Sequence, residues 1–155
     1  RADGTPIRVQ RATFDRWKID ACPHHGPGLA VDDQGVRHAV WFNFREGEGR
    51  VFYGRLPTDE QASAVAGQRT IGGKRAQHAD IATSGQRIAI VWKEFDGEQT
   101  RLLAMRSDDG GQTFRDLALD TTEGASDQPR ILTRGRELFA FWHTERQGFR
   151  LHRLP

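Results

Sequence analysis

Three tryptophans recur at a nearly constant interval along the 155-residue chain, at Trp41, Trp92 and Trp142. Each ends a short run of apolar, β-branched or aromatic residues that begins at a glycine, and the three runs are 35–41, 85–92 and 135–142. A period near 50 residues indicates a repeated structural unit. Because the runs are short and no helical spacing persists between them, the repeated unit is predicted to consist of β-strands.

Each repeat is predicted to hold up to four antiparallel strands. A short apolar strand precedes each glycine, the run to the tryptophan is the second strand, and a third follows a polar turn. A fourth strand is expected in the first two repeats, around 65–71 and 114–120. Four antiparallel strands make one blade of a β-propeller. We therefore expect a single all-β domain over 1–155, with blades at 22–72 and 73–122 and an incomplete blade at 123–155.

The two ends of the chain bear on how such a propeller closes. The last repeat lacks its fourth strand, and residues 5–10 form a β-like run ahead of the first blade, so 1–21 are expected to supply an outer closing strand and a linker. About three blades do not make a ring, since propellers have roughly 4 to 8. Either two copies join head to tail as a homodimer with six blades, or the chain is part of a longer propeller.

The turn after the third strand of the second repeat carries a recognisable motif. Its sequence, SDDGGQTF at 107–114, fits the pattern Ser-x-Asp-x-Gly-x-Thr-aromatic. This resembles the Asp box, or BNR repeat, of sialidase-like β-propellers, and indicates an uncharacterised, non-catalytic member of that family. In that family the box lies on the outer rim, away from the catalytic face. The resemblance implies a structural role for the five pattern residues, Ser107, Asp109, Gly111, Thr113 and Phe114.

The resemblance also allows the chain to be compared with the catalytic residues of sialidases. Sialidases use an arginine triad, a tyrosine nucleophile with a glutamate partner, an aspartic acid and a Phe/Tyr-Arg-Ile-Pro motif. Here the comparable stretch reads TPIR at 5–8, and the only tyrosine is Tyr53, on a predicted third strand. No catalytic residue is assigned. The sequence favours a ligand- or metal-binding or scaffold module, and the alternative is an exo-sialidase-type glycoside hydrolase, either degenerate or a fragment.

Ligand-binding candidates are expected where the inner strands line a central channel. Asp80 and Arg130 lie at the starts of two such strands. The repeated tryptophans are expected to pack between blades, whereas Trp17 lies outside the repeat and is the better candidate for contact with a ligand such as a sugar ring.

A metal site is the second hypothesis. Cys22, His24 and His25 place one thiol and two imidazoles within four residues, and these are ligands that copper and zinc accept. Superposing the repeats places His25, His78 and either Asp127 or Gln128 at the entry to the inner strand of successive blades, and Asp127 is taken as the candidate ligand. The competing interpretation is a surface loop with a small buried cysteine.

Charge and composition argue against some classes of binding partner. Lys and Arg total 23 against 21 Asp and Glu, and both signs are scattered, so no basic stripe indicates nucleic acid. No apolar run reaches the ~18 residues of a membrane span. A single cysteine excludes an intrachain disulfide. The stretch 17–27 resembles a segment of uncharacterised secreted proteins described as sialidase-like, so an extracytoplasmic location, periplasmic or secreted, is expected.

Overall fold

Every regular element in the described part of the chain is a β-strand. The computed structural model describes residues 10–16, 25–45, 48–59 and 62–155. Its strands are β1 (Gly28–Val31), β2 (Arg37–Arg45), β3 (Glu48–Arg55), β4 (Ala66–Ile71), β5 (Ala76–Ser84), β6 (Arg87–Phe95), β7 (Thr100–Ser107), β8 (Arg115–Thr122), β9 (Arg130–Arg134), β10 (Glu137–Thr144) and β11 (Gly148–Leu154). Among these residues no long apolar helix of the kind that crosses a membrane is found.

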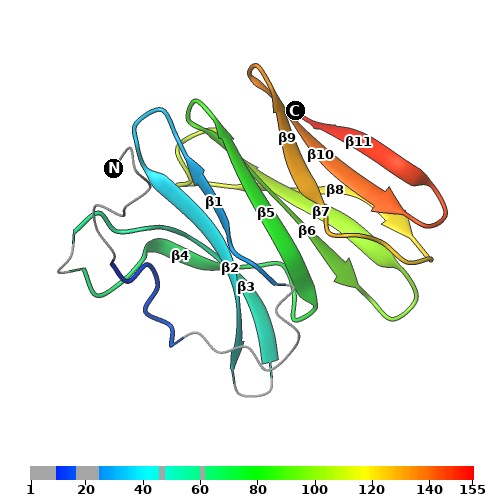
Figure 1. The fold of residues 1–155 in the computed structure, drawn as a ribbon, viewed down its shortest axis with the longest axis horizontal. Coiled ribbons are helices and arrows are strands. Elements are labelled where there is room, and N and C mark those ends of the chain that lie inside the picture. The colour runs from blue at the N-terminus through cyan, green and yellow to red at the C-terminus, as the bar shows by residue number, and fades with distance from the viewer. Residues whose placement is uncertain (1–9, 17–24, 46–47, 60–61) are drawn as a thin grey trace, which may run out of the picture.

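The strands form three antiparallel sheets whose strand order follows the chain. Sheet 1 has the order β1-β2-β3-β4, sheet 2 the order β5-β6-β7-β8, and sheet 3 the order β9-β10-β11. The first strands of the sheets lie next to one another, β1 against β5 and β5 against β9, and the sheets fan out from them (Figure 1). We call the line of β1, β5 and β9 the inner-strand edge. The predicted fold class, an all-β partial propeller, is confirmed.

The loop after the first strand of each sheet contains a glycine of the same backbone conformation. A glycine with a left-handed backbone separates the first two strands in all three, with φ of 77° at Gly35, 63° at Gly85 and 59° at Gly135. Residues with a Cβ avoid this region, so glycine allows the tight reversal that sets the strand register. The run expected at 5–10 lies outside the described residues except for Gln10, which is not in a strand.

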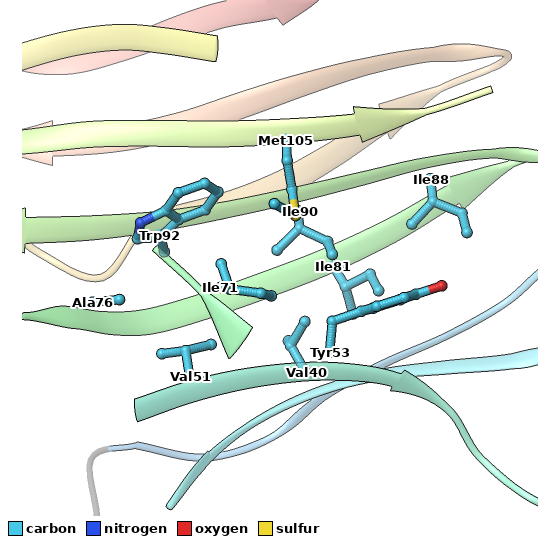
Figure 2. Close-up of a cluster of buried hydrophobic side chains, with 10 residues drawn as sticks. All are labelled: Val40, Val51, Tyr53, Ile71, Ala76, Ile81, Ile88, Ile90, Trp92 and Met105. Carbon is cyan, nitrogen blue, oxygen red and sulfur yellow. The ribbon is translucent and has the colours of Figure 1, made fainter. Parts of the chain in front are cut away.

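Sheets 1 and 2 enclose the larger core. Val40, Val51 and Tyr53 of sheet 1 face Ile90 and Trp92 of sheet 2, and all five are buried (Figure 2). Successive residues of a strand point to opposite faces, so Val51 and Tyr53 share one face of β3, and Ile90 and Trp92 share one face of β6.

Sheets 2 and 3 pack through a second core. Ala89, Val91 and Ala104 of sheet 2 contact Ala140 and Trp142 of sheet 3. The three repeated tryptophans are 5%, 3% and 0% exposed in chain order. Their predicted packing between blades is therefore confirmed for Trp92 and Trp142. Trp41 belongs instead to a third, smaller cluster on the far side of sheet 1.

Candidate functional site

Asp80 and Arg130, predicted from separate repeats, meet at the inner-strand edge. The Arg130 Nη1 atom lies 4.0 Å from Asp80 Oδ1, and the amide of Ile131 donates to Asp80 Oδ2 at 2.8 Å. The side chain of Arg130 is 58% exposed and that of Asp80 18%. The Asp80 carboxylate thus joins the first strands of sheets 2 and 3 through the Ile131 amide. The solvent-facing guanidinium of Arg130 is an ion-pair neighbour beyond hydrogen-bond distance of Asp80, and it donates to Gln128 Oε1 at 3.3 Å. Trp17, the third ligand-binding candidate, lies outside the described residues.

A bulge in β5 sets the position of Asp80. The pairing of β5 with β6 shifts register between Gln77 and Asp80, and His78 within it has a φ of 53°. A left-handed backbone is uncommon for a residue other than glycine, and bulges of this type redirect the following side chain. The bulge therefore belongs to the local structure that presents Asp80 to sheet 3.

A lysine that sequence analysis did not single out lies at the entry to sheet 3. Lys93 of β6 donates through Nζ to the carbonyl oxygen of Ser126 at 2.8 Å. Burial lowers the pKa of Lys93, and the nearby Asp127 carboxylate opposes that shift. Asp127 itself lies 3.1 Å from His143 Nδ1. Lys93 lies near the end of β6 and looks in the sequence like any polar strand residue. Only its contact with Ser126, at the entry to sheet 3, sets it apart.

Only three of the five metal-site candidates, His25, His78 and Asp127, are among the described residues. His25 stacks between Phe42, at a ring distance of 4.3 Å, and His78, at 4.4 Å. The structure therefore brings two of the predicted ligands together, as parallel rings. Asp127 contacts His143. Cys22 and His24 lie outside the described residues, and within the described residues there is no group of three or more His, Cys, Asp or Glu side chains that could hold a metal ion. The copper or zinc site stays a prediction.

The turn at 107–114 is held by its own side chains. Ser107 Oγ accepts from the amide of Gly111 at 2.8 Å, and Asp109 Oδ1 accepts from the amides of Gln112 at 3.0 Å and Thr113 at 2.9 Å. The Thr113 hydroxyl donates to Asp109 Oδ2 at 2.6 Å. These donors, the Thr113 hydroxyl foremost, hold the pKa of Asp109 well below its usual range. The turn joins β7 to β8, the two strands of sheet 2 farthest from the inner-strand edge.

Tyr53 ends a fully buried polar chain beneath this turn. Its hydroxyl lies 2.9 Å from His38 Nδ1, and His38 Nε2 lies 3.1 Å from Asp32 Oδ2. Phe114 packs edge-on against the Tyr53 ring at 5.0 Å. Burial raises the pKa of Tyr53 to about 12. The phenol is thus kept neutral and away from solvent, so Tyr53 is not placed to act as a nucleophile.

An apolar pocket lies on the other side of sheet 1. It has a volume of about 390 Å³ and is enclosed by Trp41, Leu29 and Leu56 together with Ala12 and Thr13 of the N-terminal segment. That segment is fixed by Asp15, whose carboxylate accepts from Trp41 Nε1 at 2.7 Å and from Asn43 Nδ2 at 3.0 Å.

Comparison with known proteins bears on the fold. No protein-family model and no curated relative matches the chain. A solved structure of an α-L-arabinofuranosidase (CtGH43) from Clostridium thermocellum, a β-propeller enzyme, is similar with a TM-score of 0.51 and 12% sequence identity. The match covers 84% of this chain and 46% of the enzyme, so the chain spans less than half of that neighbour. At this identity the likeness shows the fold alone, and the fold of the described chain is that of a partial β-propeller.

Proposed function

We propose that the chain is a carbohydrate-binding portion of a propeller of the glycoside-hydrolase-like kind, with its ligand at the inner-strand edge. The observation that carries the proposal is the contact between Asp80 and Arg130. It couples the first strands of two sheets in a fold that a glycoside hydrolase shares.

The chemistry of the pair suits a sugar. Arg130 is more than half exposed, so N–H donors of its guanidinium remain accessible to ligand hydroxyls or to the carboxylate of an acidic sugar. Asp80 accepts the Ile131 amide and fixes the backbone of β9 beside the guanidinium. The pair therefore offers an acceptor, Asp80, whose position is set by the Ile131 amide before a ligand arrives, which limits the entropy lost on binding, and beside it a solvent-accessible donor, Arg130.

Hydrolysis is the second candidate, favoured by the fold shared with an arabinofuranosidase. Glycoside hydrolases generally need two carboxyl groups flanking the scissile bond, and the candidates here are Asp80, which lies midway along β5 rather than at its predicted start, and Asp127, in the loop before β9. The sialidase type is disfavoured, because its nucleophile is a tyrosine and the single tyrosine of this chain is 0% exposed with a pKa of about 12.

Calorimetry with an arabino-oligosaccharide and with sialyllactose tests the binding proposal. Arg130→Ala removes a charged donor, and loss of such a contact weakens binding by roughly 10- to 100-fold. Arg115→Ala, an exposed arginine on the outer strand β8, serves as the matched control and should bind like the wild type. Absence of binding by the wild type, or equal weakening by both variants, would refute the proposed site.

Chromogenic α-L-arabinofuranoside and fluorogenic sialic acid substrates separate binding from hydrolysis. We expect binding without turnover. Turnover of either substrate that disappears in Asp80→Asn would show that the chain is a hydrolase and that Asp80 takes part in the reaction.

A further inference from the structure

The sheet 1–sheet 2 interface and the sheet 2–sheet 3 interface are built in the same way. Sheet 2 presents its Trp92 face to sheet 1, and sheet 3 presents its Trp142 face to sheet 2. In each case the preceding sheet offers the face that does not carry its own tryptophan. The series leaves two faces without a sheet against them in the described chain, the tryptophan face of sheet 1 and the opposite face of sheet 3.

The open face of sheet 3 exposes large apolar side chains between charged ones, Arg130 and Arg134 of β9, Glu137 of β10 and Arg153 of β11. The strand register places Leu132 opposite Phe139 and Leu151 opposite Phe141 on that side. Phe149 stacks on Phe141 at a ring distance of 5.4 Å and is 70% exposed. We call these residues, Leu132, Phe139, Phe141, Phe149 and Leu151, the phenylalanine face.

The corresponding face of sheet 1 also has no sheet against it in the described chain, although the N-terminal segment packs on its centre through Phe14 and Asp15. Leu29 pairs with Ala39 and Phe52 with Trp41 on one side of the sheet, and Val31 lies on the same side of β1. Leu29 is 60% exposed and Val31 53%. The pocket of about 390 Å³ lies on this side. We call these residues, Leu29, Val31, Ala39, Trp41 and Phe52, the Trp41 face.

The exposed apolar side chains of the described residues are concentrated on these two faces. Six large ones are exposed, namely Leu29, Val31, Phe95, Leu132, Phe149 and Leu151, and all but Phe95 belong to one face or the other. Exposed apolar residues that gather on particular faces mark interaction sites, whereas single scattered ones need no explanation. Their location at both ends of the stack of sheets indicates that the stack continues.

We propose that the phenylalanine face of one copy packs against the Trp41 face of a second copy, and that the reciprocal contact closes a ring. The new contact repeats the geometry of the two internal interfaces, a tryptophan face against the opposite face of the preceding sheet. Two copies of three sheets fall within the roughly 4 to 8 blades of known propellers. The inner-strand edges of both copies then line one channel, so each copy contributes an Asp80–Arg130 pair.

Light scattering of the purified chain, coupled to size exclusion at micromolar concentration, tests this proposal. The wild type should have twice the 17.5 kDa mass of the chain. Phe149→Arg places a charge on the phenylalanine face and should give a single-chain mass. Phe95→Arg makes the same change at an exposed phenylalanine outside both faces and should leave the mass at two chains. Circular dichroism checks that each variant is folded.

Leu29→Arg distinguishes a head-to-tail ring from a symmetric pairing of like faces. The proposal requires that this change on the Trp41 face also gives single chains. A Leu29→Arg variant that keeps the two-chain mass would overturn the head-to-tail arrangement. A wild type with the mass of one chain would overturn the second copy as occupant and leave the faces to be covered by other sheets. A series of larger masses would overturn closure, because head-to-tail contacts that do not close form open filaments.

Discussion

Tyr53 is held by contacts from two sheets. Its hydroxyl meets His38 on the neighbouring strand of sheet 1, while its ring meets Phe114 of sheet 2. Burial raises its pKa to about 12, above the ordinary value of 10.0. Because the folded state favours the neutral phenol, ionisation does not change the free energy of unfolding below about pH 10, and that free energy falls as the pH rises toward 12.

The ultraviolet absorbance of tyrosinate reports this group without interference, since Tyr53 is the only tyrosine. We expect a titration midpoint near 12, or a later rise that coincides with alkaline unfolding. Tyr53→Phe supplies the blank. A midpoint near 10 in protein whose circular dichroism is still native would contradict the buried network.

Residue-level features were predictable only where they are local. Ser107 and Asp109 bond to amides two to four residues away, so a short motif is enough to predict those contacts. His38 and Tyr53 meet across a strand pair, and Tyr53 meets Phe114 across sheets. The sequence contains these residues but not the pairing that joins them, so the buried network was not foreseen.

The turn at 107–114 makes hydrogen bonds within itself and also contacts sheet 1. Gly111 has a φ of 81°, and a Cβ built on it would overlap the Tyr53 hydroxyl. Arg69 of sheet 1 donates to the carbonyl oxygen of Gln112 at 3.1 Å and lies over the Phe114 ring at 4.9 Å. The turn therefore fastens the outer part of sheet 2 to sheet 1, as well as joining β7 to β8.

Substitutions at the adjacent Gly110 and Gly111 distinguish the local backbone requirement of the turn from its contact with sheet 1. Gly110 also has a left-handed φ, of 67°, but a Cβ there meets no atom within 4 Å. Gly110→Ala should lower the free energy of unfolding by about 1 kcal/mol, from backbone strain alone. Gly111→Ala adds overpacking against Tyr53 and should cost about 3 kcal/mol. Urea denaturation measures both. Equal losses would mean that the contact with Tyr53 does not hold the turn.

The strands and turns could be predicted from the sequence because each repeat has its own turn glycine and its own runs of apolar residues. The left-handed Gly35, Gly85 and Gly135 each precede a second strand, and the strands expected near 65–71 and 114–120 lie at 66–71 and 115–122. The bulge at His78 was not predicted, because it depends on how β5 meets its neighbours rather than on a turn residue.

At the scale of the whole molecule, three sheets share one inner edge and leave two faces that carry exposed apolar side chains without a sheet against them in the described chain. The tryptophan period predicted the number of sheets. It placed Asp80 and Arg130 on inner strands, but their contact, and the Ile131 amide on the same carboxylate, depend on how sheet 3 settles against sheet 2. The metal candidates Cys22 and His24 remain outside what the structure describes.

The central claim is that the inner-strand edge binds the ligand. The Ile131 amide reports directly on this edge, because it donates to Asp80 at 2.8 Å. Amide chemical shifts of ¹⁵N-labelled protein, titrated with an arabino-oligosaccharide and with sialyllactose, test the claim. We predict that the amides of Asp80 and Ile131 shift with either sugar while Gln112 in the outer turn does not. Shifts confined to the outer turn or to the phenylalanine face, or no shifts at all, would contradict it.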